Sequence, residues 1–242
     1  MPEVKTKKGK DMENNVLIKT EKLVKRYPMG GTQLSALKDV NLAIKKGEFC
    51  GVVGPSGSGK TTLLNIIGSL DVPTEGSAIV MGKAVEKLSQ KEAAKLRNKY
   101  IGFIFQTFNL LPVYTVYENV ELPLLLLGYD KASREKMIMD ALEWVDLIDK
   151  RDLRPSTLSG GESQRVAVAR AMVKRPEIVL ADEPTANLDS KNSFNILEMM
   201  VDINKELKTT FIFATHDEKV MKYLKRKISL IDGKIAKDEL IK

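Results

Sequence analysis

The sequence predicts an α/β fold built on a mostly parallel sheet, because short apolar runs alternate along the chain with longer helical patterns. One apolar run, at residues 49–53, ends in a glycine-rich loop that opens a helix. That order is typical of a buried strand followed by a phosphate-binding loop. A mostly helical stretch at residues 90–173 predicts a helical subdomain inserted between the strands.

Composition agrees with a globular chain and excludes some kinds of site. The 242 residues are 43% apolar and 29% charged, which suits one compact domain or one domain with a subdomain. The net charge of +7 allows a nucleotide, a nucleic acid or a membrane surface as partner and does not choose among them. The single cysteine, Cys50, excludes an intrachain disulfide, and the single histidine, His216, excludes a histidine-rich metal site.

The first part of the chain is expected to hold a tail, two strands, a turn and a helix. The tail is at residues 1–15, the strands are at 16–18 and 40–44, the turn is at 45–48 and the helix is at 61–70. The tail is expected to be flexible, and it lacks the apolar core of a secretory signal. A membrane-spanning helix needs roughly 20 apolar residues. The longest apolar run, at residues 122–127, is much shorter and contains Pro123, so no span is predicted.

The second part of the chain returns from helices to strands. Helices are predicted at 91–98, 133–147, 161–173 and 192–207, and strands at 178–181, 211–214 and 228–231. Asp232 and Gly233 follow the last strand and predict a hairpin turn. Trp144 falls on a helical pattern and is expected in the core.

The glycine-rich loop matches the pattern G-x-x-x-x-G-K-[ST] in full, between a predicted strand and a predicted helix. Its residues are Gly54, Pro55, Ser56, Gly57, Ser58, Gly59, Lys60 and Thr61, and Thr62 follows them. Glycines let backbone N–H groups turn toward phosphate oxygens, and the helix start adds partial positive charge. Lys60 can reach the β- and γ-phosphates, and the Thr61 hydroxyl can bind Mg²⁺. A plain glycine-rich turn is the competing interpretation, and the strand–loop–helix context disfavours it.

Two carboxylates, Asp182 and Glu183, follow the predicted strand at 178–181. In a parallel sheet the carboxyl ends of the strands form the ligand crevice. Asp182 can there hold Mg²⁺ or its water, and Glu183 can polarise a water that attacks the γ-phosphate. An ordinary strand-ending turn is the alternative, and the phosphate loop upstream disfavours it.

The stretch Leu158-Ser-Gly-Gly-Glu-Ser-Gln-Arg165 resembles the LSGGQ signature of ABC-type ATPases, with Ser159 standing 23 residues before Asp182. Further resemblances occur in family order. Tyr27 is similar to the aromatic residue that stacks on adenine, Gln106 to the Q-loop glutamine, Asp189 to the D-loop aspartate and His216 to the switch histidine. Together they cover roughly residues 16–240.

The resemblance implies the ABC-ATPase form of the P-loop NTPase fold. Residues 16–242 would form one ATPase domain with an antiparallel β subdomain and a helical subdomain at about 107–173. It implies hydrolysis of ATP with Mg²⁺, organised by Thr61, Gln106 and Asp182. Glu183 would act as general base, and His216 would contact the γ-phosphate.

The signature is interpreted as a second phosphate cradle. Ser159 offers a hydroxyl, and Gly160 and Gly161 expose backbone N–H groups at a helix start, beside Glu162. The resemblance implies that this cradle, with Asp189, serves ATP bound to the opposite subunit. Two copies would then form a head-to-tail dimer around two ATP molecules.

The sequence is further similar to the group that drives lipoprotein release and macrolide export, the LolD and MacB type, through Phe105–Pro112 and Asp182–Asp189. Glu162 and Ala186 depart from the commonest family pattern, and Thr61 keeps the hydroxyl of the usual serine. An integral membrane permease is the expected partner, no nucleic acid is expected, and the chain would sit peripherally on the cytoplasmic face. The apolar stretch 108–116 would border the groove for that partner, or alternatively form subdomain core.

Three other functions stay open at this point. An importer ATPase for a small solute fits the same catalytic residues, and the stretch 105–112 disfavours it. A soluble ABC ATPase acting on DNA or ribosomes would need a long coiled-coil insertion or a second cassette, for which 242 residues leave no room. A non-catalytic binding module is least favoured, because every hydrolytic position is filled.

Overall fold

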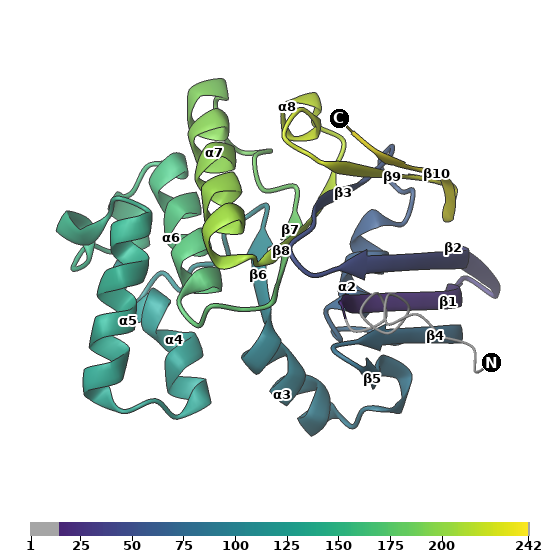
Figure 1. Ribbon diagram of the computed structural model, residues 1–242, viewed down its shortest axis with the longest axis horizontal. Coiled ribbons are helices and arrows are strands. Elements are labelled where there is room, and N and C mark those ends of the chain that lie inside the picture. Colours follow the sequence, from purple (N-terminus) through teal and green to yellow (C-terminus); the bar gives the residue numbers. More distant parts are fainter. Residues whose placement is uncertain (1–14, 242) are drawn as a thin grey trace, which may run out of the picture.

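The computed structural model describes residues 15–241, which form two sheets and a group of helices (Figure 1). The smaller sheet is antiparallel, with strand order β2-β1-β4-β5. Its strands are β1 (Val16–Met29), β2 (Thr32–Lys45), β4 (Glu75–Val80) and β5 (Lys83–Ala84). The expected tail lies almost wholly outside the described residues.

The larger sheet has six strands in the order β10-β9-β3-β8-β7-β6. Its strands are β3 (Phe49–Val53), β6 (Ile101–Phe105), β7 (Ile178–Asp182), β8 (Thr210–Thr215), β9 (Arg226–Ile231) and β10 (Lys234–Leu240). All neighbouring pairs are parallel except β9 with β10. The predicted mostly parallel sheet is therefore confirmed.

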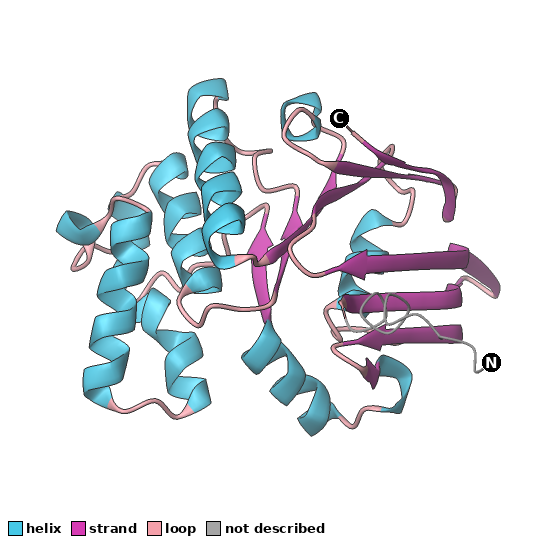
Figure 2. Ribbon diagram, in the orientation of Figure 1, coloured by secondary structure: helices cyan, strands magenta, loops and turns pink. Residues whose placement is uncertain are grey.

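The helices lie beside the two sheets, and those of residues 116–207 gather at the end of the molecule opposite the antiparallel strands (Figure 2). The helices are α2 (Lys60–Ile67), α3 (Gln90–Tyr100), α4 (Val116–Leu127), α5 (Lys131–Trp144), α6 (Gly160–Met172), α7 (Ser190–Leu207) and α8 (Glu218–Met221). Short 3-10 turns lie at Val85–Lys87, Ile148–Lys150 and Pro155–Thr157. Between β6 and β7 the chain is helical, as expected, and the exact limits of 107 and 173 for a helical subdomain stay a prediction.

Local sequence sets where several of these helices begin. Helices α3, α4 and α6 start at Ser89, Thr115 and Ser159, and each N-cap hydroxyl accepts from the backbone N–H of a glutamate three residues on. Each glutamate in turn accepts from the N-cap N–H, which completes a capping box. Two of the orphan donors at each helix start are satisfied in this way.

The prediction that residues 90–173 are mostly helical is wrong at one strand, β6, which pairs in parallel with β7. A run of five apolar and aromatic residues is too short for its hydrophobic periodicity to distinguish a strand from a helix. Pairing with β7 in the folded protein makes this run a strand. The strands of the small sheet are longer than the sequence predicts, because β1 and β2 have 14 residues each. The sequence predicts no strand at β4. Helix α4 carries Pro123 in its interior, which hid it from the pattern.

Apolar residues pack on both faces of the six-stranded sheet. Along β8, Phe211 and Phe213 face the cluster shared with the helices, whereas Ile212 and Ala214 face the cluster shared with the small sheet. This alternation buries every residue of β8, which explains its continuous apolar run. Trp144 packs partly buried against the helical cluster, so the core prediction holds for its apolar surface.

Candidate functional site

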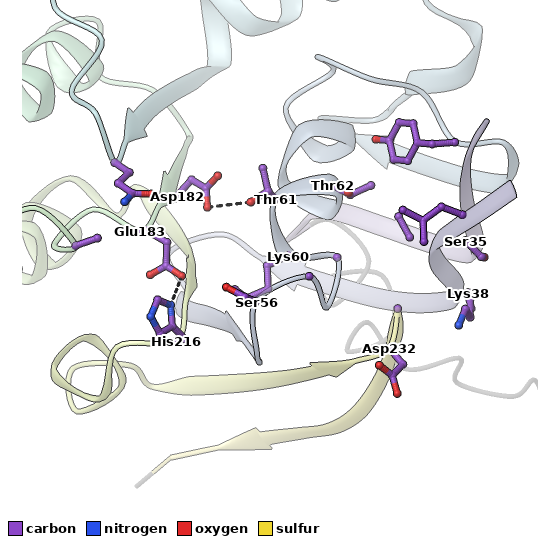
Figure 3. Close-up of a pocket in the computed structure, with 18 residues that line it drawn as sticks. Ser35, Lys38, Ser56, Lys60, Thr61, Thr62, Asp182, Glu183, His216 and Asp232 are labelled. Atoms are coloured by element: carbon purple, nitrogen blue, oxygen red, sulfur yellow. Dashed lines mark hydrogen bonds and ion pairs between the residues drawn. The ribbon is translucent and has the colours of Figure 1, made fainter. Parts of the chain in front are cut away.

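A cavity of about 770 Å³ lies at the carboxyl ends of the parallel strands (Figure 3). It brings together eleven of the residues singled out in the sequence. These are Tyr27, Ser56, Gly57, Gly59, Lys60, Thr61, Thr62, Gln106, Asp182, Glu183 and His216. Ligands of open α/β sheets bind at this edge, so the strand order itself positions the site.

The phosphate loop joins β3 to α2 and requires glycine at two places. Gly59 adopts a φ of +103°, and a Cβ there would lie 2.4 Å from the Ala36 carbonyl oxygen. A Cβ on Gly54 would lie 2.1 Å from the Leu230 carbonyl oxygen. The loop is therefore held against β2 and β9 so closely that no side chain fits, and its backbone faces the cavity.

Lys60 is nearly buried, and its ammonium group lies over the loop. Its Nζ donates to the carbonyl oxygens of Gly54 and Pro55 over 2.8 and 3.0 Å. The Ser58 hydroxyl is buried with no hydrogen-bond partner among the described residues. Polar groups of this kind, converging on a concave loop at a helix start, fit a phosphate chain.

Asp182 ends β7 and meets the first turn of α2. The Thr61 hydroxyl donates to its Oδ1 over 3.3 Å. Burial raises the pKa of Asp182, and the nearby carboxylate of Glu183 adds to the rise, although Thr61 and Lys60 oppose it. A half-buried carboxylate beside a hydroxyl suits Mg²⁺, which takes one or two protein oxygens and completes its shell with phosphates and water. The described residues hold no cluster of three acidic, histidine or cysteine side chains that could bind a metal by itself.

Glu183 has both carboxylate oxygens engaged. Its Oε1 lies 2.7 Å from His216 Nδ1, and its Oε2 accepts from the Thr215 hydroxyl over 2.9 Å. The backbone of Glu183 has a φ of +45°, a strained conformation for a residue with a side chain. Its N–H donates to the Ala214 carbonyl oxygen, so the strained residue is fixed against the end of β8. The carboxylate is thereby aimed in one direction, at the cavity edge beside the phosphate loop.

Tyr27 and Gln106 line the cavity from different sheets. Tyr27 stands on β1, where its hydroxyl donates to Asp71 Oδ2 over 2.7 Å. Gln106 follows β6 directly, and its backbone oxygen accepts from the Asn187 side chain over 2.9 Å. The Gln106 side chain is exposed and free to approach a ligand at the strand ends.

The signature residues and Asp189 do not line this cavity. Ser159 caps α6, and the Glu162 carboxylate accepts from its N–H and hydroxyl and pairs with Lys150. These bonds from Lys150 and Ser159 lower the pKa of Glu162 to about 2. Asp189 caps α7 and accepts from Asn192, which itself lies against Gly161. Gly160 and Gly161 thus start a helix whose N-terminal end lies outside the cavity of their own chain.

Sequence reasoning missed several residues that line the cavity. Leu34, Ser35, Ala36 and Lys38 come from β2, and Asp232 and Gly233 come from the β9–β10 hairpin (Figure 3). The hairpin tip meets the loop because the Gly233 N–H donates to the Ser58 carbonyl oxygen over 3.1 Å. The hairpin turn itself was predicted, but nothing in its local pattern indicates what it contacts.

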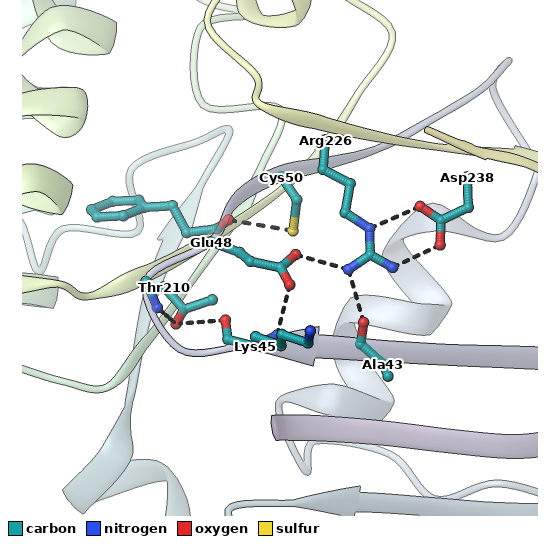
Figure 4. Close-up of polar contacts among 9 residues, drawn as sticks. Ala43, Lys45, Glu48, Cys50, Thr210, Arg226 and Asp238 are labelled. Carbon is teal, nitrogen blue, oxygen red and sulfur yellow. Dashed lines mark hydrogen bonds and ion pairs between the residues drawn. The ribbon is translucent and has the colours of Figure 1, made fainter. Parts of the chain in front are cut away.

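A half-buried arginine holds this hairpin in place (Figure 4). Arg226 donates to Glu48 over 2.8 Å and makes two bonds to Asp238, at 2.8 and 2.7 Å. It also donates to the Ala43 carbonyl oxygen of β2 over 2.8 Å. One guanidinium therefore ties β2, the start of β3 and both strands of the hairpin together.

The profile of the ABC transporter family matches residues 37–186, from β2 through the acidic pair. The chain belongs to the ABC transporter ATPases. The lipoprotein-releasing system ATP-binding protein LolD of Pseudoalteromonas translucida is 45% identical over 223 residues, which are 92% of this chain and 96% of that protein.

Solved structures of ABC cassettes share the fold. The cassette MJ0796, solved as a dimer in a post-hydrolysis state with ADP and Pi, superposes with a TM-score of 0.86 at 43% identity, over 93% of this chain and 99% of that one. CbiO1 of Clostridium perfringens, part of the transporter complex cbiONQ, superposes with a TM-score of 0.84 at 29% identity, over 93% and 89%. This ABC ATPase has, within residues 15–241, no helix long and apolar enough to cross a membrane.

Proposed function

We propose that this ABC ATPase is the motor subunit of a lipoprotein-release type transporter and drives a separate integral membrane permease. One observation carries the catalytic part: Glu183 is aimed by His216 and Thr215 at the edge of a cavity that also holds the phosphate loop. The 45% identity to LolD supports the transporter type.

The cavity residues that the sequence singled out each have a role in this proposal. Tyr27 stacks on the adenine, and the loop with Lys60 and Thr62 binds the phosphates. Mg²⁺ held by Thr61, Asp182 and Gln106, the last two through water where needed, would neutralise phosphate charge. Glu183 orients the attacking water and accepts its proton, because its carboxylate lines the cavity and is not the one that contacts Thr61. His216 contacts the γ-phosphate through the ring edge that does not face Glu183.

The signature completes the site across a dimer. Ser159, Gly160 and Gly161 form a helix start that does not line the cavity of their own chain, so it would serve the cavity of a second copy in head-to-tail orientation. Glu162 rigidifies this helix start, and Asp189 fixes the neighbouring start of α7. The dimeric state of MJ0796 supports this arrangement.

The permease would dock beside the Q-loop, with the ATPase on the cytoplasmic face of the membrane. Leu111 and Val113 are 41% and 70% exposed there, which favours the partner groove over subdomain core for these two side chains. Arg170 and Lys174 line a neighbouring hollow of about 240 Å³, and burial lowers the pKa of Lys174 to about 8. Within residues 15–241, no carboxylate forms an ion pair with Arg170 or Lys174. A partner that carries an acidic side chain would therefore complement the positive charge of this hollow.

The residue Glu183 provides the test of catalysis. Glu183→Gln keeps the shape of the side chain but cannot accept a proton, so ATP binding stays and turnover falls by a factor of about 10² or more. Phosphate release and nucleotide binding are measured on the same preparation, with dimer content by size-exclusion chromatography in ATP. The variant is expected to accumulate as an ATP-bound dimer. Turnover within threefold of the natural protein would remove Glu183 from the base role.

The partner is tested by capturing membrane proteins from detergent-solubilised membranes with tagged Glu183→Gln protein and ATP. A membrane protein with few spans and a large extracytoplasmic domain is the expected result. A many-span permease with a solute-binding protein would instead support an importer of a small solute. Recovery of ribosomal or DNA-repair proteins alone would overturn the transport proposal and leave the ATPase standing.

A further inference from the structure

The loop after α2 carries a carboxylate that reaches back to the adenine end of the cavity. Asp71 Oδ2 accepts from the Tyr27 hydroxyl over 2.7 Å. Its Oδ1 accepts from Lys25 Nζ over 2.6 Å and from the Val72 N–H over 2.7 Å. Burial alone would raise the pKa of Asp71, but the hydrogen bonds from Lys25 and Tyr27 hold it below its usual value. The group is therefore a fixed anion with three donors.

Lys25 completes the arrangement from the same strand as Tyr27. The two residues are two positions apart on β1, so both side chains project from the same face. Lys25 Nζ lies 4.9 Å from the centroid of the Tyr27 ring and also donates to the Val72 carbonyl oxygen over 2.8 Å. One face of the ring is thus covered by an ammonium group that is itself nearly buried, at 9% exposure.

The ring of Tyr27 is consequently held at its far end and on one face. A tyrosine near the end of a strand rotates about two side-chain torsions, and an unanchored ring would sample several orientations. Asp71 fixes the hydroxyl and Lys25 covers one face, which leaves the other face as the one that can meet a planar ligand. A ring that is already oriented loses less rotamer freedom when a base stacks on it, and this raises the binding affinity.

We propose that Asp71 is a positioning residue of the nucleotide site, which presents the Tyr27 ring to the base by holding its hydroxyl and by placing Lys25 behind it. The proposal rests on the adenine contact assigned to Tyr27 in the proposed function. Asp71 touches no phosphate-loop residue through a hydrogen bond in the described chain, so its effect should be confined to ligands that carry a base.

The test compares a ligand with a base to one without. Binding of ADP and of inorganic pyrophosphate is measured by calorimetry on the full chain, for the natural protein, Asp71→Ala, Tyr27→Phe and the double variant. Asp71→Ala and Tyr27→Phe should each weaken ADP about threefold to tenfold, a fraction of the loss that follows removal of a whole base–aromatic stack. Pyrophosphate affinity should stay within about twofold. The Tyr27 hydroxyl also contacts the Thr62 side chain, so the ADP loss of Tyr27→Phe counts for Asp71 only where its pyrophosphate affinity is unchanged. In the double variant the two losses should fall short of their product, because the bond between Tyr27 and Asp71 is common to both.

Controls separate positioning from general damage. Glu75→Gln breaks an exposed ion pair with Arg26, also on β1, and should leave both affinities unchanged. Asp71→Ala leaves Lys25 unpaired and lowers stability, whereas Tyr27→Phe keeps that pair. Tyr27→Phe therefore decides the question even if Asp71→Ala does not fold.

Three results would overturn the proposal: unchanged ADP affinity in Tyr27→Phe, an equal loss of pyrophosphate affinity, or multiplicative losses in the double variant. Tyr27→Ala distinguishes this failure from that of the proposed function. If Tyr27→Ala weakens ADP while Tyr27→Phe does not, only the positioning role fails. If Tyr27→Ala has no effect, the adenine contact itself is wrong and both fall.

Discussion

The hydroxyl of Thr215 gives the sharpest prediction about the catalytic carboxylate. Thr215 is fully buried at the end of β8, and its hydroxyl donates to Glu183 Oε2 over 2.9 Å. Thr215→Val keeps the shape and removes this donor. A hydrogen bond to a charged group contributes about 1.5–3 kcal/mol. If that energy holds the carboxylate in its working direction, kcat falls by about tenfold to a hundredfold, at about 1.4 kcal/mol per tenfold.

Steady-state phosphate release measures this effect, and KM for ATP should stay within about twofold, because Thr215 does not line the cavity. The same hydroxyl accepts from the Asp217 N–H over 3.0 Å, so the valine variant also loses about 1–3 kcal/mol of stability. Thr215→Ser keeps the donor and should retain most of the rate.

Thr210→Val is the matched control for a loss of stability without a loss of catalysis. Thr210 is equally buried at the other end of β8, where its hydroxyl accepts from the Gly47 N–H over 2.9 Å. Its substitution should lower the melting temperature similarly and leave kcat unchanged. A kcat of Thr215→Val within threefold of the natural protein, or an equal loss in Thr210→Val, would refute the reasoning.

Two further predictions concern stability. The pKa of Glu162 is lowered from 4.5 to about 2. The natural protein should therefore resist urea better than Glu162→Gln above pH 4.5, and the difference should shrink steadily as the pH falls toward 2; a constant difference would contradict this. A Cβ on Gly102 would lie 2.7 Å from the Ala171 carbonyl oxygen, so Gly102→Ala should cost about 1–3 kcal/mol in urea unfolding. The comparison is Gly160→Ala, where the nearest atom is 3.6 Å away, and equal losses would speak against strand–helix crowding.

The parallel strands could be predicted because burial on both faces makes each a continuous apolar run. Residues 49–53, 178–181 and 211–214 are such runs, and the six-stranded sheet contains all three. The phosphate loop was equally predictable, since its glycines, lysine and hydroxyl meet chemical needs that few other residues satisfy. Strands with one polar face were harder: β4 and the long arms of β1 and β2 carry no run that separates them from loops.

The order of the chemical residues along the chain also determined much of the candidate site. Asp182 and Glu183 end one strand, and Thr215 and His216 lie at the end of its neighbour. The sequence predicts that both strands lie in a parallel sheet, and the observed pairing of β7 with β8 brings their ends together, which places Glu183 beside His216.

Only the tertiary structure decided which distant segments close the cavity. The hairpin tip at Asp232 reaches the phosphate loop because Arg226 joins the hairpin to β2. Asp71 meets Tyr27 across 44 residues of chain, and no local pattern predicts such a pair. A motif such as the phosphate loop depends on the local chemistry of the backbone and the ligand, so consecutive residues are enough to identify it. Contacts between sheets depend on how whole elements pack, and that information is spread over the entire core.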